Sequence, residues 1–209
     1  MRFAFWWIGA IAMAPRLVSA QQVRLAPQLG IYVPTERLYQ LASGTGSDDD
    51  FRLEAGPAIG ARLGIWFGRR FGVEVGGNYV PTTFSFGGPG GTTKQDAKLF
   101  TGTGQAVVFL LPPTSILSVF ASGGLAVVSR GGVAFTNEAT TTNVGGVVGV
   151  GVSFGGLGGL GLTVGADLLG YQADYRGSQA VSQAVSQRDL NVKVGFGVPF
   201  GGGGGGAGR

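Results

Sequence analysis

The feature that most constrains this chain is an alternation of apolar and polar residues along eight separate segments. It is clearest over residues 51–67, where every odd position from Phe51 to Phe67 is apolar and the even positions carry all the charges. Because successive side chains of a β-strand point to opposite faces, this period of two predicts strands with one wholly apolar face. The pattern recurs at residues 23–33, 71–80, 98–111, 117–128, 143–154, 160–168 and 189–200. It is least regular at residues 98–111.

The connections between the segments alternate in length. Long polar connections fall at 36–50, 85–97, 130–142 and 173–188, and short ones at 68–70, 112–114 and 155–159. Outer-membrane barrels have this asymmetry, with short periplasmic turns and longer extracellular loops. The sequence therefore predicts an all-β fold, an eight-stranded antiparallel up-and-down transmembrane β-barrel with both chain ends on one side.

The composition indicates which face of the strands points outward. Charged residues are 12% of the chain, whereas a soluble domain has about a quarter. The polar phase is rich in Gly, Ala and Ser, which suits a narrow interior, and large aromatic residues lie near strand ends on the apolar phase, as in an interfacial girdle. We therefore expect the apolar face to contact lipid. A soluble barrel of lipocalin type, with the apolar face inside, is the alternative.

A membrane-spanning helix is a second alternative for one part of the chain. Residues 144–166 carry no charge and are long enough to span a bilayer. Glycine recurs throughout this stretch, for example at Gly149, Gly151 and Gly155, and each glycine weakens a helix. Valine alternating with glycine favours a strand.

Both ends of the chain differ from the barrel region. Residues 1–20 begin with a positive Arg2, continue with an apolar run and end in Val18-Ser19-Ala20, which predicts a cleaved signal peptide. Residues 21–200 would then form the barrel, and residues 201–209 a flexible Gly-rich tail.

The opening strand LAPQLGIYVP (25–34) and the closing strand DLNVKVGFGVPF (189–200) resemble those of a known family, the small outer-membrane β-barrels of OmpA/OmpX-like type. The resemblance implies a location in the cell outer membrane, with outer-membrane lipid as a partner. It also implies that the closing strand is read by the barrel-assembly machinery, with Phe200 as its terminal aromatic residue, although Gly201–Arg209 follow it here.

The charges on the phase expected to face inward are candidate site residues. They are Arg24, Arg52, Glu54, Arg62, Glu74, Asp167, Asp189 and Lys193. Because unpaired buried charge is costly and eight strands leave a narrow interior, we expect a paired polar network that closes the lumen. The alternative is a pathway for ions or small solutes.

The residue inventory excludes several kinds of chemistry. The chain has no His and no Cys, so a Ser-His-Asp triad and thiolate metal sites are impossible. The Asp48-Asp49-Asp50 run is expected to be a hydrated loop, so neither a metal site nor a cofactor is predicted. Without Arg2 and Arg16 the net charge falls from +4 to +2, and no basic cluster for nucleic acid is left.

The sequence thus predicts a protein that is not an enzyme. We expect a structural or surface-interaction barrel with a closed polar lumen and four extracellular loops, among them residues 178–187 (SQAVSQAVSQ). A small-solute or ion channel and a soluble secreted ligand-binding barrel are the alternative functions.

Overall fold

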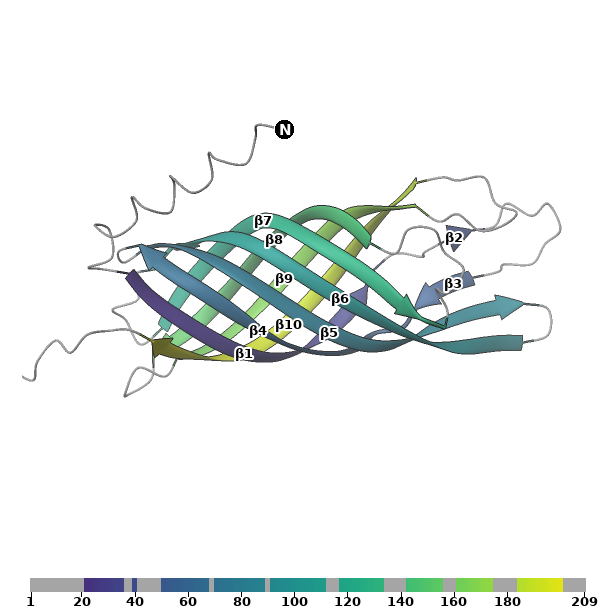
Figure 1. The fold of residues 1–209 in the computed structure, drawn as a ribbon, viewed down its shortest axis with the longest axis horizontal. Helices are drawn as coiled ribbons and strands as arrows, with labels where there is room; N and C mark the ends of the chain where they lie inside the picture. Colours follow the sequence, from purple (N-terminus) through teal and green to yellow (C-terminus); the bar gives the residue numbers. More distant parts are fainter. Residues whose placement is uncertain are drawn as a thin grey trace, which may run out of the picture.

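Eight long strands close into an antiparallel barrel in the computed structural model of this chain (Figure 1). The structure describes residues 21–35, 39–40, 50–67, 70–88, 91–111, 117–133, 142–155, 161–174 and 184–200. The predicted signal peptide (1–20) and the Gly-rich tail (201–209) lie outside these residues.

The ring is built in chain order, each strand antiparallel to its neighbours. Its members are β1 (Gln21–Pro34), β4 (Gly56–Phe67), β5 (Phe71–Gly88), β6 (Gly91–Phe109), β7 (Leu117–Gly132), β8 (Thr142–Gly155), β9 (Gly161–Asp174) and β10 (Ala184–Phe200). Two short strands, β2 (Tyr39–Gln40) and β3 (Asp50–Leu53), extend the sheet beyond one end of the ring. The eight-stranded up-and-down barrel predicted from the sequence is confirmed.

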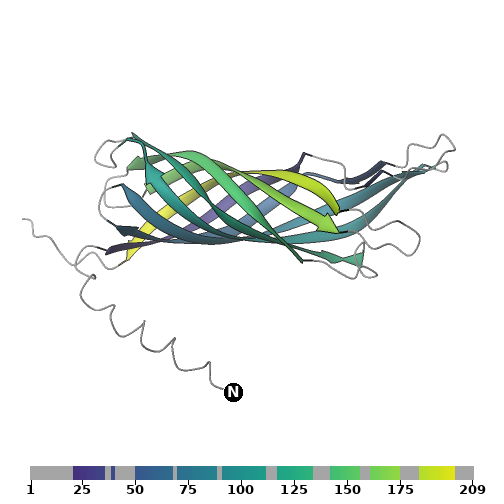
Figure 2. The same ribbon diagram turned by 90° about the horizontal axis from the view of Figure 1, so that it is seen from above.

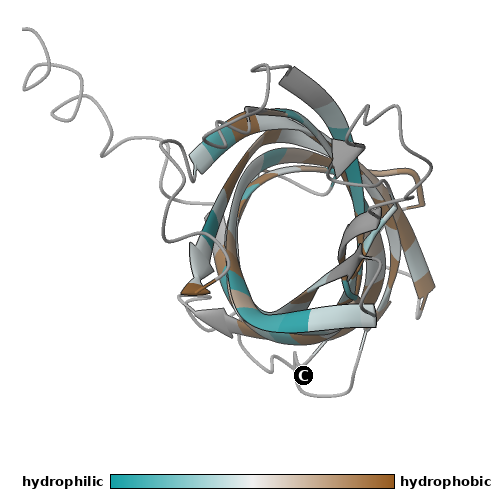
Figure 3. Ribbon diagram, turned by 90° about the vertical axis from the view of Figure 1, so that its right-hand side faces the viewer, coloured by the Kyte–Doolittle hydropathy of each residue, from teal (hydrophilic) through white to brown (hydrophobic). Residues whose placement is uncertain are grey.

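The ring closes where the first strand meets the last. β1 pairs with β10 in a register that runs from Val23 opposite Phe200 to Pro34 opposite Asp189. Seen along the barrel, the strands form a continuous ring (Figure 3). Closure matters because an open strand edge in hydrocarbon would leave N–H and C=O groups without hydrogen-bond partners.

The apolar phase of the strands points out of the barrel. Leu29 is 63% exposed and Leu125 is 68% exposed, whereas Tyr32 and Val128 on the opposite phase are fully buried. Tyr79 and Phe100 lie side by side on the outer surface, with ring centroids 5.0 Å apart. An exposed belt of this kind suits lipid and does not suit water, so a soluble barrel with its apolar face inside is excluded.

The described residues of the uncharged stretch 144–166, which are 144–155 and 161–166, are strand and not helix. They contribute most of β8 and the first half of β9, as the alternation of valine with glycine predicted. No helix within the described ranges has the length and apolar character needed to cross a membrane.

One predicted loop is wrong. The connection expected at 85–97 is mostly strand: β5 and β6 continue past the ring as a paired hairpin, with Gly88 opposite Gly91 (Figure 2). Gly91 has a φ of 116°, a conformation that side-chain-bearing residues rarely adopt. In the β6 arm of the hairpin, residues 91–96 (GTTKQD) are all polar or Gly and all exposed, so this arm lacks the alternation of a half-buried strand.

Three other boundaries also differ from the prediction. β7 continues to Gly132 and β10 begins at Ala184, so the connections expected at 130–142 and 173–188 are shorter, and part of the repeat 178–187 is strand. The single strand expected over 51–67 is interrupted at Glu54-Ala55, which separates β3 from β4. β3 pairs with the projecting part of β5, whereas β4 pairs with its barrel part.

The outward belt predicts a depth-dependent cost of charge. Leu125 lies in the middle of β7, so Leu125→Arg should destabilise the folded barrel by about 2–4 kcal/mol in urea unfolding from lipid vesicles. The matched change Leu117→Arg, at the end of the same strand, should cost about 0–1 kcal/mol. Equal costs at the two positions would contradict a lipid-facing surface.

Candidate functional site

The barrel interior consists of layers. We call the end that carries the β5–β6 hairpin the loop end, and the opposite end, where β4 passes to β5, the turn end. The inner phase is expected to carry charges and small residues, and near both ends it also holds large buried apolar side chains. At the loop end the buried apolar residues are Tyr32, Leu53, Ala58, Val80, Ala97, Leu99, Ala126, Val128, Val147, Leu169, Tyr171 and Ala173.

An aromatic cluster fills the turn end. Trp66, Phe109 and Phe120 pack with Val107, and the ring centroids of Trp66 and Phe109 are 4.8 Å apart. Phe109 meets Phe120 edge to face at 6.0 Å. Glycines make room for these rings: an added Cβ at Gly72 would lie 2.5 Å from Trp66, and one at Gly151 would lie 2.4 Å from Phe120.

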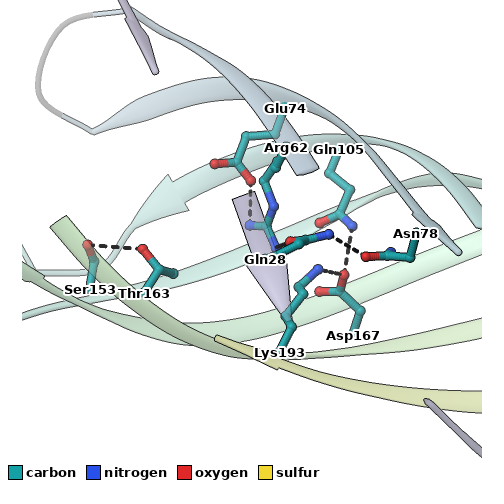
Figure 4. A network of polar contacts seen from close by, with 9 residues as sticks. All are labelled: Gln28, Arg62, Glu74, Asn78, Gln105, Ser153, Thr163, Asp167 and Lys193. Atoms are coloured by element: carbon teal, nitrogen blue, oxygen red, sulfur yellow. Dashed lines mark hydrogen bonds and ion pairs between the residues drawn. The ribbon is translucent and has the colours of Figure 1, made fainter. Parts of the chain in front are cut away.

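A polar layer lies between the two apolar ones (Figure 4). Arg62 donates to the Glu74 carboxylate at 2.7 Å and to the side-chain amide oxygen of Gln28 at 3.4 Å. Gln28 in turn donates to Asn78 at 2.6 Å, and Asn78 donates to Thr101 at 3.2 Å. A single chain of hydrogen bonds thus connects the four neighbouring strands β1, β4, β5 and β6 on the inside of the barrel.

A second ion pair completes this layer. Lys193 of β10 forms an ion pair with the carboxylate of Asp167 on β9, and both side chains are 6% exposed. Gln105 of β6 donates to the same carboxylate at 3.3 Å from the other side of the barrel. Each charge in this part of the lumen therefore meets an opposite charge, which is the arrangement that buried charge requires.

A further buried group lies closer to the loop end. Asp189 accepts hydrogen bonds from the hydroxyls of Tyr171, at 2.5 Å, and of Tyr32. Arg130 lies over the Tyr171 ring, 5.1 Å from its centroid, and donates to Asn143 at 2.8 Å. Sequence reasoning missed Arg130 because it falls in the connection expected at 130–142; its spacing of two from Val128 is the signal that could have placed it on the inner phase.

The structure brings some of the candidate residues together and leaves others apart. Arg62, Glu74, Asp167 and Lys193 meet in the polar layer, and Arg24 lies beside it toward the turn end. The backbone of Arg52 lies in β3, opposite Ser85 of the hairpin. Glu54 does not join the lumen network, because the strand is interrupted at this residue and its carboxylate turns to the hairpin.

Glu54, at the rim of the barrel, forms hydrogen bonds with the projecting hairpin. Its carboxylate accepts hydrogen bonds from Lys94 at 2.7 Å and Ser85 at 2.6 Å. These contacts, that of Lys94 first, stabilise the charged form and hold the pKa of the Glu54 carboxyl below its usual value.

A small cavity separates the polar layer from the aromatic cluster. Its volume is about 30 Å³, room for about two water molecules. Arg24, Arg62, Lys193, Trp66, Ser153 and Thr163 are among the residues that line it. In Figure 4, Ser153 and Thr163 lie apart from the two ion pairs, with their hydroxyl oxygens 3.5 Å from one another.

The described part of the chain contains no cluster of three or more acidic side chains placed to hold a metal ion. Phe200, expected to end the assembly signal, is the last residue of β10 and lies opposite Val23 of β1.

Several solved structures of outer-membrane proteins share this architecture. Outer membrane protein OprG of Pseudomonas aeruginosa superimposes with a TM-score of 0.64 at 12% identity, covering 86% of this chain and 96% of that one. This chain has the fold of an outer-membrane β-barrel. Its lipid-facing belt and its closed ring of eight strands carry the same conclusion independently.

Two further structures share the fold of this outer-membrane barrel. Escherichia coli outer membrane protein W matches with a TM-score of 0.54 at 16% identity, over 87% of this chain and 98% of that one. Neisserial surface protein A matches with a TM-score of 0.53 at 14% identity, over 86% and 97%. No protein-family model and no curated protein sequence matches the chain.

The buried pair of Asp167 and Lys193 gives a direct test of the polar layer. Asp167→Ala leaves an ammonium buried without its carboxylate and should destabilise the barrel by about 3–5 kcal/mol, measured by denaturant unfolding in lipid. The double change Asp167→Leu with Lys193→Met removes both charges and should recover most of that loss. A cost below about 1 kcal/mol for the single change would mean that the pair is solvated.

Proposed function

We propose that this barrel is a surface-interaction protein that binds an extended segment of an extracellular partner along the β5–β6 hairpin. The observation that carries the proposal is the open outer edge of β6 in the hairpin. Outer-membrane barrels place their longer connections outside the cell, so the hairpin at the loop end faces the exterior.

The two edges of the hairpin differ. On the β5 side, β3 pairs with the hairpin from Phe51 opposite Phe86 to Leu53 opposite Phe84. On the β6 side, pairing with β7 begins only at Ala97 opposite Gly132. Residues 91–96 (GTTKQD) are all exposed, and within the described part of the chain no strand pairs with their outer edge.

An open strand edge presents unpaired N–H and C=O groups to any chain that can adopt an extended conformation. Binding by strand addition uses these groups for affinity and alternate side chains for specificity. Lys94 and Asp96 place charges on this edge, a device that natural proteins use against indiscriminate pairing. The ion pair of Lys94 with Glu54 also holds the hairpin to the barrel rim.

The interior favours this role over a channel. The aromatic cluster, the polar layer and the loop-end apolar layer all place buried side chains inside the barrel. An eight-stranded barrel has little interior beyond what its side chains occupy.

The rest of the functional assignment follows from the sequence. A chain without His and Cys supports a role without catalysis. Export through residues 1–20, contact with outer-membrane lipid and assembly by the barrel-assembly machinery through Phe200 complete the proposal.

The experiment removes the hairpin and keeps the barrel. Thr82 and Ala97 are directly opposed, so residues 83–96 can be replaced by an Asn-Gly turn. The probe is a phage library of random ten-residue peptides, panned on the wild type in lipid nanodiscs. The wild type should enrich peptides with strand-type alternation, and the shortened variant should lose at least tenfold of their binding.

A charge-reversed control separates strand addition from simple electrostatics. Lys94→Asp with Asp96→Lys keeps the edge and the net charge and should retain binding of some of the enriched peptides. Undiminished binding to the shortened variant would overturn the proposal. Single-channel steps from the wild type in planar bilayers, abolished by an Arg62 substitution, would support the channel instead.

A further inference from the structure

The cavity between the polar layer and the aromatic cluster is lined by N–H donors that have no partner. Arg24 Nε and Trp66 Nε1 are both buried and without a hydrogen-bond partner, and both residues line this cavity. Neither group can act as an acceptor, so each requires a lone pair from whatever occupies the space. Leaving such donors unsatisfied would cost their full desolvation penalty.

The charges around the cavity do not balance. Arg62 is paired with Glu74, and Lys193 with Asp167. Arg24 is a third cation on the same cavity, and no carboxylate of the described residues lies within ion-pair distance of it. The cavity walls thus carry one positive charge more than the protein neutralises.

Two glycines leave the space that the Arg24 side chain occupies. An added Cβ at Gly197 would lie 2.5 Å from Arg24 Cδ, and one at Gly161 would lie 3.4 Å from Arg24 Nη1. The side chain therefore lies against the bare backbone of β9 and β10, which limits how far its guanidinium can move away from the cavity. Ser153 and Thr163 are on the same lining; the Thr163 hydroxyl donates to Ser153, so the Ser153 hydroxyl adds one further donor.

We propose that this cavity is a binding site for one small monovalent inorganic anion of the halide class. Water would satisfy the donors, but only an anion also neutralises the excess charge of Arg24. A volume of about 30 Å³, room for about two water-sized particles, admits a halide with a water molecule. The carboxylates of Glu74 and Asp167 beside the cavity disfavour a second negative charge. This site is independent of the proposed partner binding at the hairpin.

The direct test is bromide as a probe on the wild-type barrel. Crystals grown in sodium bromide should show an anomalous scattering peak in the cavity near Arg24 and Trp66. A peak elsewhere only, or water alone in the cavity, would overturn the proposal. This test requires no variant and leaves the hairpin proposal unaffected whichever way it turns out.

The solution test compares anions at constant ionic strength. Thermal unfolding of the refolded barrel, followed by its heat-modifiable gel mobility, should shift upward by about 2–4 °C in chloride relative to gluconate when chloride is at about five times its dissociation constant. Gluconate is the reference because it is a monovalent organic anion much larger than chloride. Arg24→Gln and, as a milder change, Trp66→Phe should reduce or abolish the shift.

The matched control is Lys94→Gln, which removes an exposed cation outside the lumen and should keep the full chloride shift. Equal melting temperatures in chloride and gluconate for the wild type would contradict the proposal, as would a chloride shift that Lys94→Gln abolishes and Arg24→Gln preserves.

Discussion

The pairing of β1 with β10 is the interaction on which the rest of this structure depends. It joins residues 23–34 to residues 189–200, and so removes the last pair of open strand edges from the part of the sheet that lies in lipid. Without it, the exposed apolar face that runs through Leu29 and Leu125 would belong to an open sheet with unsatisfied backbone groups in hydrocarbon. With it, the backbone is satisfied and the apolar face becomes the surface that the membrane requires.

Closure with eight strands also determines the width of the interior that side chains must fill. The lumen is too wide to be filled by backbone alone and too narrow to be an open pore, so side chains must fill it. Aromatic and aliphatic groups do so at the two ends, and paired charges do so between them. Arg24 has no carboxylate of the described residues within ion-pair distance, and the adjacent cavity is where an anion would neutralise it.

The strands and the direction of their faces could largely be predicted from the sequence, whereas the side-chain contacts inside the barrel could be predicted only in part. The period of two places Leu29 outside and Tyr32 inside without knowledge of any neighbour, so the strands and their faces could be predicted. The hairpin could not, since Thr92, Thr93 and Lys94 are solvated on both faces and show no alternation. Phe109 and Phe120 are register partners on the neighbouring strands β6 and β7. They were missed as interior residues because they stand on the phase that Thr101, Gln105 and Ser118 mark as polar. Glu54 was misplaced because an interruption of a strand leaves no mark in the alternation.

The most direct test of the account is a disulfide across the closing seam. Leu29 and Val194 are register partners on β1 and β10, and the natural chain has no cysteine, so Leu29→Cys with Val194→Cys introduces a single possible bridge. After refolding into lipid and mild oxidation, the account predicts near-complete intramolecular cross-linking, seen as a mobility change that reductant reverses. The control pair Leu29→Cys with Val148→Cys, on strands that are not neighbours, should remain unlinked. Equal cross-linking of the two pairs, or none in the first, would contradict a barrel closed by β1 and β10.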